Sequence, residues 1–213
     1  MMIYFITAAE EILYTQGIQG VTIRNVAEKA GYSSGTLYNY FEDLDELILF
    51  ASLKSFKNYA NMLCEAAKHS ENELAFYYNV LGLFMKMSFE NPDIFMNLFY
   101  GKHSPRLNAI INEYYCLFPG ELLKQRNNIA YAEIINKLMK EGSMLIRDTE
   151  ILTAVANAGL IKKDSVAHLA LIMTALEESY INRLCGRNRD GADKEALYEE
   201  FMTLAHVVVE LCR

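Results

Sequence analysis

The sequence is poor in the residues that interrupt helices or cross-link chains. Its 213 residues include three prolines, no tryptophan and four cysteines. The cysteines are scattered, without a C-x-x-C pair, which argues against both a zinc site and a disulfide framework. Free cysteines fit the reducing cytoplasm, where we expect the protein. The scarcity of proline favours an all-α fold.

Long apolar runs and the motifs of catalytic sites are also lacking. No apolar run reaches about 18 residues, so we expect no membrane span. The first residues lack the basic start and the cleavage site of a signal peptide. The four histidines show no metal-ligand spacing, and no nucleophile or phosphate-loop motif occurs. We therefore predict no enzyme activity, no metal and no cofactor.

The chain is instead rich in apolar residues at helical spacing. Hydrophobic residues make up 52% of it and charged residues 22%, a composition typical of a globular protein. Apolar residues three and four apart, with breaks at proline and glycine, predict a series of helices and no strand. These helices are expected over residues 3–16, 23–30, 34–40, 44–68, 72–90, 92–100, 105–117, 120–141, 143–157, 164–186 and 193–212.

Residues 22–41 form the most informative stretch. Thr22 can cap a short helix, because its hydroxyl can accept a backbone N–H of the first turn. Gly31 can end that helix in the left-handed conformation, and Ser33 can cap a second helix. Two short helices joined by a tight turn with glycine form a helix-turn-helix, whose second helix enters the major groove of DNA.

The run from Val21 to Phe41, above all Gly-Thr-Leu-Tyr-Asn-Tyr-Phe at residues 35–41, resembles the DNA-binding domain of TetR-family transcriptional repressors. The resemblance extends over about residues 3–50. It implies an N-terminal three-helix domain, joined by one long helix to a helical ligand-binding and dimerisation bundle. We predict a domain boundary that divides residues 1–46 from residues 47–213.

The resemblance also implies which residues face DNA. They are Thr22, Arg24, Ser33, Ser34, Gly35, Thr36, Tyr38, Asn39 and Tyr40. Hydroxyl groups and the guanidinium suit phosphate contacts, and an asparagine can bond the edge of an adenine. For the two tyrosines the alternative is packing against the first helix.

Positive charge is scarce in this domain. Residues 1–50 hold two cations, Arg24 and Lys29, against seven anions, a local charge of −5. DNA-binding domains in general carry a basic patch, which this domain lacks. Many TetR-family members have a basic residue in place of Ser34, a lysine in place of Leu44 and a basic arm before the first helix. Three explanations stay open: a start further upstream, affinity through hydroxyl and backbone contacts, or weak or absent DNA binding.

Aromatic and methionine residues crowd the middle of the chain. For each of them, core packing is the plainer interpretation. The other interpretation is a cavity for an effector, since ligand sites are mostly apolar and can lie between the helices of a bundle. Our candidate ligand-binding residues are Phe84, Met85, Phe89, Phe95, Tyr100, Tyr114, Tyr115 and Met173.

The last two helices carry apolar stripes at helical spacing, and the resemblance implies that they form a four-helix bundle with a second subunit. The candidate dimerisation residues are Leu169, Met173, Leu176, Tyr180, Phe201, Leu204 and Val208. Further apolar residues on adjacent faces suggest a second contact surface, namely Ala167, Leu171, Ile172, Ile181, Val207 and Val209.

These observations predict a TetR-like homodimer that binds a pseudo-palindromic double-stranded DNA operator, most simply as a repressor. A small, largely apolar effector in the C-terminal domain would change the operator affinity. The alternative is a helical ligand- or protein-binding dimer that keeps this fold but binds DNA weakly or not at all.

Overall fold

The computed structural model describes residues 1–121, 130–186 and 191–213, and only the backbone of residues 55–58. Within these ranges the chain forms helices and turns without a strand, which confirms the all-α prediction. Among the described helices, none combines the length and the apolar character needed to cross a membrane.

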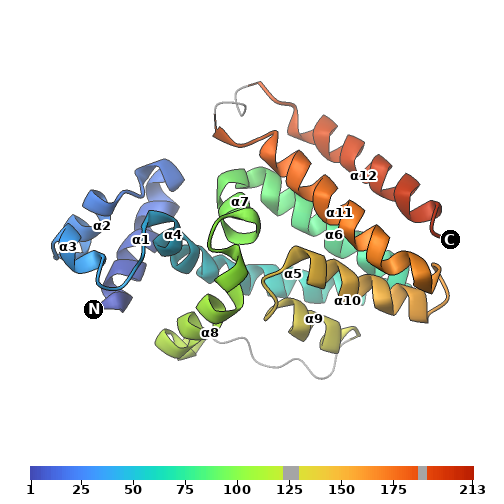
Figure 1. Cartoon of the computed structure of the whole chain (residues 1–213), viewed down its shortest axis with the longest axis horizontal. Coiled ribbons are helices and arrows are strands. Elements are labelled where there is room, and N and C mark those ends of the chain that lie inside the picture. Colours follow the sequence, from blue (N-terminus) through green and yellow to red (C-terminus); the bar gives the residue numbers. More distant parts are fainter. Residues whose placement is uncertain (122–129, 187–190) are drawn as a thin grey trace.

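The N-terminal end of the molecule consists of α1 (Met2–Gln16), α2 (Ile23–Ala30), α3 (Ser34–Leu37) and the start of α4 (Leu44–Ser52), drawn in blue in Figure 1. A 3₁₀ turn, η1 (Ile18–Gly20), joins the first two helices. Helix α1 packs against both α2 and α4. The small core of this domain is made by Phe5, Ile6, Val26, Leu37 and Phe41, none more than 1% exposed.

The predicted caps of the helix-turn-helix are confirmed. The Thr22 hydroxyl accepts the Asn25 N–H at 3.1 Å, and the Ser33 hydroxyl accepts the Thr36 N–H at 3.2 Å. Gly31 closes α2 with φ of 77°, in the left-handed region that favours glycine.

The second helix of the motif is shorter than predicted, because α3 ends at Leu37 instead of residue 40. After it the backbone tightens, with the Asn39 N–H bonding the Thr36 carbonyl at 3.2 Å and the Tyr40 N–H bonding the Leu37 carbonyl at 3.0 Å. These bonds join residues three apart, as in a 3₁₀ turn, so the α-helical pattern does not continue.

The prediction of one uninterrupted helix over residues 44–68 is wrong. Helix α4 passes into a 3₁₀ turn, η2 (Leu53–Ser55), and α5 follows (Phe56–Lys68). The Ser52 hydroxyl donates to the Ile48 carbonyl at 2.7 Å, a bond to the fourth residue back that bends helices. The connection between the domains therefore consists of two helical segments.

The C-terminal part contains α6 (Glu73–Glu90), α7 (Pro92–Tyr100), α8 (Leu107–Leu117), α9 (Ala132–Leu138), α10 (Met144–Asn157), α11 (Val166–Asn182) and α12 (Lys194–Glu210). Between them, the described residues include the 3₁₀ turns η3 (Ser104–Arg106), η4 (Pro119–Glu121) and η5 (Lys163–Ser165). Of the helix predicted over residues 120–141, residues 122–129 lie outside the described part of the chain, and α9 covers a stretch near its end.

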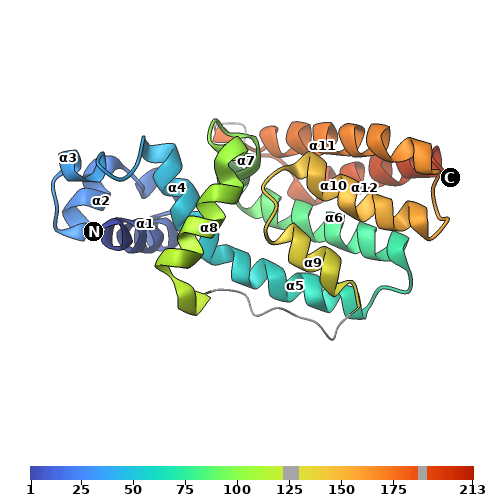
Figure 2. The same ribbon diagram turned by 60° about the horizontal axis from the view of Figure 1, so that its bottom comes forward.

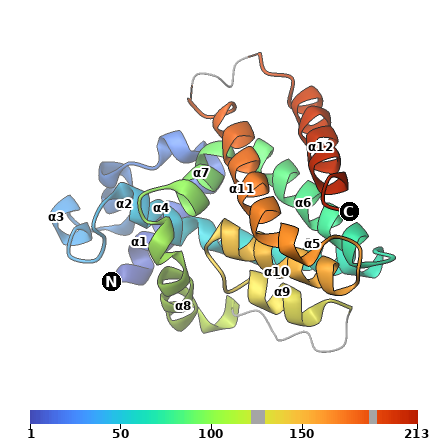
Figure 3. The same cartoon turned by 45° about the vertical axis from the view of Figure 1, so that its right-hand side comes forward.

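Helix α6 is the central element of this bundle. It packs against α5, α10, α11 and α12, and Figure 3 shows α10 and α11 side by side with α12 on the outside. The approach of α12 is close, because a Cβ added at Gly82 would lie 2.7 Å from the Tyr198 hydroxyl. Helices α7 and α8 sit at the junction with the N-terminal domain, where both contact α4 (Figure 2).

Substitution of Gly31 by alanine tests the turn of the helix-turn-helix. The left-handed conformation places a Cβ too close to the backbone, so the free energy of unfolding should fall by about 1 kcal/mol. Gly35 provides the control, since its φ is not in that region and an added Cβ would come no closer than 3.8 Å to the Ser33 hydroxyl. Urea denaturation should show a loss for Gly31→Ala and none for Gly35→Ala; equal effects would contradict the assigned turn.

Candidate functional site

The exposed surface of the helix-turn-helix carries several of the predicted DNA-facing residues. Arg24, Ser33, Gly35, Tyr38 and Asn39 are exposed. Tyr38 has 57% of its surface accessible, and within the described chain Arg24 forms no ion pair. A guanidinium and a phenol hydroxyl are thus available for a phosphate or a base edge.

The small hydroxyl residues of the motif are already hydrogen-bonded. Thr22 and Ser33 cap helices, and the hydroxyls of Ser33 and Thr36 lie 2.9 Å apart. A hydroxyl has both a donor and two acceptor positions, so each can still bond an incoming group. Their first role is to hold the turn, and Ser34 beside them is half-buried.

The two tyrosines of the motif occupy different environments. The Tyr40 ring is half-buried, with its centroid 6.1 Å from that of Phe5 in α1. Of the two tyrosines, Tyr40 is therefore the one that packs against the first helix. Tyr38 is exposed and is the tyrosine placed to meet a partner.

Most of the acidic residues of this domain are paired within the subunit. Glu11 lies 2.7 Å from Lys29, and the buried Glu10 lies 3.2 Å from Lys54 at the start of the connection. Three further acids, between α3 and the first turn of α4, pair with basic residues of the C-terminal domain. Five of the seven anions counted in the sequence are therefore opposed by a cation of the same chain.

The junction network consists of Glu42, Asp43 and Glu46 on one side and Lys102, His103 and Arg106 on the other. Asp43 contacts Lys102 at 2.5 Å and the buried His103 at 2.9 Å, and Glu46 contacts Arg106 at 3.1 Å. Partial burial acts to raise the pKa of Asp43, but hydrogen bonds from Lys102, the Glu46 amide and His103 outweigh it and lower the pKa to about 2. This carboxyl is ionised at neutral pH.

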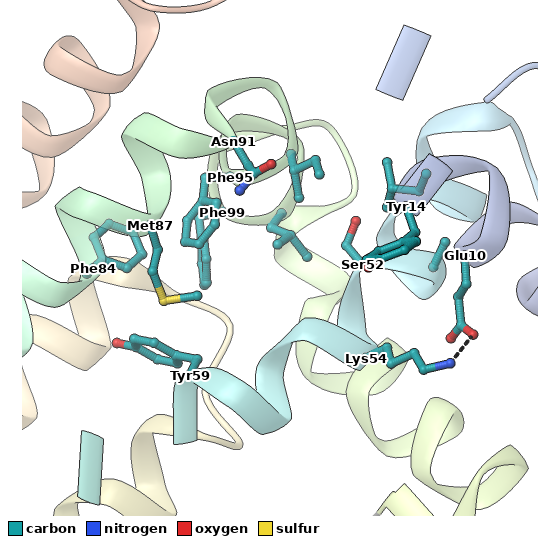
Figure 4. A pocket seen from close by; sticks show the side chains of 14 residues that line it. Glu10, Tyr14, Ser52, Lys54, Tyr59, Phe84, Met87, Asn91, Phe95 and Phe99 are labelled. Atoms are coloured by element: carbon teal, nitrogen blue, oxygen red, sulfur yellow. Dashed lines mark hydrogen bonds and ion pairs between the residues drawn. The ribbon is translucent and has the colours of Figure 1, made fainter. Parts of the chain in front are cut away.

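A cavity of about 490 Å³ lies between the two domains (Figure 4). Its walls come from α1, α4, η2 and α5 on one side and from α6 and α7 on the other. The lining residues are Glu10, Leu13, Tyr14, Ala51, Ser52, Lys54, Tyr59, Phe84, Met87, Asn91, Ile94, Phe95, Leu98 and Phe99.

The cavity is apolar at one end and polar at the other. Phe84, Phe95 and Phe99 form a group of rings with centroids 5.4 to 6.0 Å apart. At the other end lie Glu10 and Lys54 (Figure 4). Burial raises the pKa of Glu10, although Lys54 and the Tyr114 hydroxyl, which donates to it at 3.0 Å, act to lower that pKa.

Some of the predicted ligand-binding residues line the cavity, and the others lie outside its lining. Phe84 and Phe95 line this cavity. Met85, Phe89, Tyr114 and Met173 are buried outside its lining, Tyr100 bonds Glu177 at 3.3 Å, and the half-buried Tyr115 packs on Tyr114. Sequence reasoning missed the lining residues of α1 and η2. They precede Phe84, the first of the predicted ligand-binding residues, in the sequence, and no local pattern marks them.

Residues 5–50 match the sequence model of bacterial regulatory proteins of the tetR family. The N-terminal domain is a DNA-binding domain of the tetR family. This is a DNA-binding regulatory family and not a family of enzymes. The chain matches no curated protein.

Solved structures, a TetR-family repressor among them, share the fold along almost the whole chain. FadR of Thermus thermophilus in complex with lauroyl-CoA is 14% identical, covers 97% of this chain and 93% of its own, and superposes with a TM-score of 0.59. FadR of Bacillus subtilis in complex with stearoyl-CoA is 16% identical, covers 98% of each chain and has a TM-score of 0.53. RolR in complex with resorcinol is 14% identical, covers 99% and 92%, and has a TM-score of 0.55. Similarity at this level establishes the fold alone.

The last two helices keep most of the predicted dimerisation stripe inside the subunit. Leu169, Met173, Tyr180 and Phe201 are at most 4% exposed, since α11 packs against α10, α7, α12 and α6, and α12 packs against α11 and α6. Leu176 and Val208 are half-buried, and Leu204 is exposed. The four buried side chains therefore cannot form a surface for a second subunit. The apolar side chains that do reach the surface are Leu171, Ile172, Leu204, Val207 and Leu211.

Removal of the Tyr38 hydroxyl tests its contact with DNA. Because a hydrogen bond to a charged group contributes about 1.5 kcal/mol, Tyr38→Phe should weaken operator binding about tenfold. Tyr38→Ala should weaken it further, with helicity and dimerisation unchanged. Tyr14→Phe removes the same hydroxyl from a residue at the rim of the cavity and should leave DNA affinity unchanged. Fluorescence anisotropy with labelled operator measures all three; unchanged binding by both Tyr38 variants would show that the recognition face is assigned wrongly.

Proposed function

We propose that this protein is a homodimeric transcriptional regulator, most simply a repressor, whose operator affinity changes when an effector occupies the cavity between its domains. The protein acts in the cytoplasm, where operator DNA lies. Arg24 and Tyr38 make the leading DNA contacts of each subunit, and Asn39 reads a base edge.

The observation that carries this proposal is the shared cavity. A ligand that fills it touches α1 and α4, which position the helix-turn-helix, and at the same time α6 and α7 of the bundle. Such a ligand changes the spacing of the two sets of walls. This is allosteric regulation, because the ligand favours the arrangement of the domains that it fits best, and the coupling between ligand and DNA is reciprocal.

The junction network transmits this change. Lys102 and Arg106 follow α7 directly, and they hold Asp43 and Glu46 at the start of α4. A shift of α7 against α6 therefore moves the start of α4 together with the adjoining recognition helix. Because α4 and α5 are separated by a 3₁₀ turn, the N-terminal domain can tilt without moving the whole bundle.

The ion pairs of the acidic residues support DNA binding, although the net charge of residues 1–50 is negative. Ion pairs inside the subunit neutralise most of the acidic side chains, and those of Glu42, Asp43 and Glu46 are directed toward the C-terminal domain. Phosphate repulsion depends on charge near the DNA face, since exposed charges farther than about 10 Å are largely screened. The count over residues 1–50 thus overstates the repulsion.

The effector is largely apolar in this proposal. The cavity has an aromatic end, and structurally similar proteins hold lauroyl-CoA, stearoyl-CoA and resorcinol, all of which have an apolar or aromatic part. A volume of about 490 Å³ lies within the range of small-molecule sites.

A gel-shift titration with the intergenic DNA beside the gene, at low and moderate salt, tests DNA binding. We expect a specific shift that weakens as salt rises, because each neutralised phosphate releases a counterion. Arg24→Ala should weaken binding and reduce the salt dependence, whereas Lys140→Ala, at an exposed position in the distal bundle, should change neither. A full-length protein that gives no specific shift at low salt would refute the proposal.

Charged substitutions on the exposed apolar face of α11 and α12 test the dimer. Leu171 and Val207 are 58% and 53% exposed, so glutamate is tolerated in a monomer but is costly in a buried interface. The double variant Leu171→Glu, Val207→Glu should be monomeric by light scattering and should lose at least tenfold in operator affinity. Ile146→Glu, on an exposed position of α10, is the matched control; a dimeric double variant would place the interface elsewhere.

A further inference from the structure

A buried polar cluster lies in the bundle, beyond the wall of the large cavity. Asp148 of α10 and Glu177 of α11 are 4% and 1% exposed. Tyr77 of α6, Tyr100 of α7 and Tyr59 of α5 surround them. Carboxylates are rarely buried unless they are paired, so the partners of these two decide what the cluster can do.

The nearby guanidinium does not pair with them. Arg147 donates to the carbonyls of Leu138 and Glu141 and, at 3.1 Å, to the Tyr59 hydroxyl. It also lies 5.6 Å and 5.4 Å from the ring centroids of Tyr59 and Phe99. Within the described residues it makes no ion pair with either carboxylate. Its donors are already directed to other groups.

Within the described residues, the hydrogen bonds to the two carboxylates come from hydroxyl groups. Thr174 donates to Asp148 at 2.9 Å, and Tyr100 donates to Glu177 at 3.3 Å. Burial raises the pKa of Asp148 to about 7. Burial, followed by the proximity of Asp148, raises the pKa of Glu177 well above its ordinary value. Arg147 lines the same void and acts to lower the pKa of both carboxyls, but burial outweighs this effect, so its charge does not offset the cost of two buried carboxylates.

A third polar group in the cluster has no hydrogen-bond partner in the described part of the chain. The Tyr77 hydroxyl is buried and forms no hydrogen bond, although a buried polar group without a partner destabilises a fold by about 1–3 kcal/mol. Tyr77, Asp148 and Glu177 line the same small void of about 10 Å³, which has room for at most one water molecule. Three acceptor groups, two carboxylates and one hydroxyl, thus line one small void together with Arg147.

This void adjoins the large cavity. Tyr59 and Phe84 line both, so their side chains form the partition between them. Phe84 belongs to the group of rings at the apolar end of the large cavity. A displacement of the Phe84 ring would join the two spaces into one site with an apolar chamber and an acidic end.

We propose that the effector is an organic cation, a primary ammonium group attached to an apolar body. The ammonium binds Asp148, Glu177 and the Tyr77 hydroxyl, and the apolar body occupies the large cavity. An ammonium has three donors, which equals the number of these acceptors, and aromatic rings around a cation add to its binding. No group of three or more His, Cys, Asp or Glu side chains among the described residues is placed to hold a metal ion, so an organic cation fits better. This inference rests on the proposed function, in which the large cavity holds the effector.

Phenylalkylamines with two, four and six methylenes provide the probes, each compared with the alcohol and the carboxylic acid of the same length. Isothermal titration calorimetry on the full-length native protein should show at least one amine that binds tenfold or more tightly than its alcohol, and acids that bind no better than the alcohols. If no amine binds more tightly than its alcohol, the cationic class is refuted.

Variants locate the site. Glu177→Gln and Asp148→Asn should each reduce the affinity for the preferred amine at least tenfold and leave the affinity for the alcohol unchanged. Glu178→Gln removes the same charge from the next, exposed residue of α11 and should bind the amine like the native protein. Equal losses in Glu177→Gln and Glu178→Gln would refute the assignment. Thermal melts check that the variants fold.

Proton release gives an independent measurement. The titratable groups around the ammonium are Tyr59, Tyr77, Tyr100, Arg147, Asp148 and Glu177, and Asp148, whose pKa burial raises to about 7, changes charge near neutral pH. Because bound ammonium favours the ionised forms of the carboxyls, amine binding at pH 6 should release protons, seen as a binding heat that depends on the buffer. Affinity should rise from pH 5 to pH 7; an affinity independent of pH and buffer contradicts the proposal.

The two proposals can fail separately. Amine binding is measured without DNA, and operator binding is measured without amine. Weaker operator binding on addition of the preferred amine would support both. Amine binding without any specific operator binding would refute the regulatory function and leave the cationic site standing.

Discussion

The hydrogen bonds that converge on Asp43 hold the two domains in place. One oxygen of this carboxylate caps α4 by accepting the Glu46 N–H at 2.9 Å, and the same oxygen lies 2.9 Å from the His103 ring. The other oxygen meets Lys102 at 2.5 Å. One side chain thereby begins the connecting helix and attaches it to the loop after α7. The position of the recognition helix relative to the bundle depends on this contact.

The same arrangement resolves the apparent conflict between fold and charge. Acidic residues at the start of a helix are favourable because they face the positive end of its dipole. Here they also bind Lys102 and Arg106 from the other domain. Their charge serves the connection between domains, while Arg24 on the opposite part of the motif remains exposed. The net charge of the domain does not show that the acidic residues lie at the junction while Arg24 lies on the exposed surface of the motif.

The interior of the bundle shows a second kind of charge placement. Two carboxylates and an unpartnered tyrosine hydroxyl are buried where a purely apolar core would be more stable. Such groups are more readily understood as part of a site than as part of the packing, since binding a cation would satisfy all of them. Two aromatic side chains, Tyr59 and Phe84, separate these groups from the large cavity. The buried polar groups, which destabilise the fold, are therefore close to the proposed ligand.

The sequence by itself determined the local features. Helical spacing, the caps at Thr22 and Ser33 and the turn at Gly31 depend on residues within four positions of each other, and the family resemblance rests on the same short stretch. Only the tertiary structure decided which apolar stripes are core and which are surface, because a helix with two apolar faces gives the same pattern in either case. It likewise brought Glu10 and Tyr59 to one cavity with Phe84, and Asp148 to Glu177. Those contacts join helices far apart in the chain, and no local spacing encodes them.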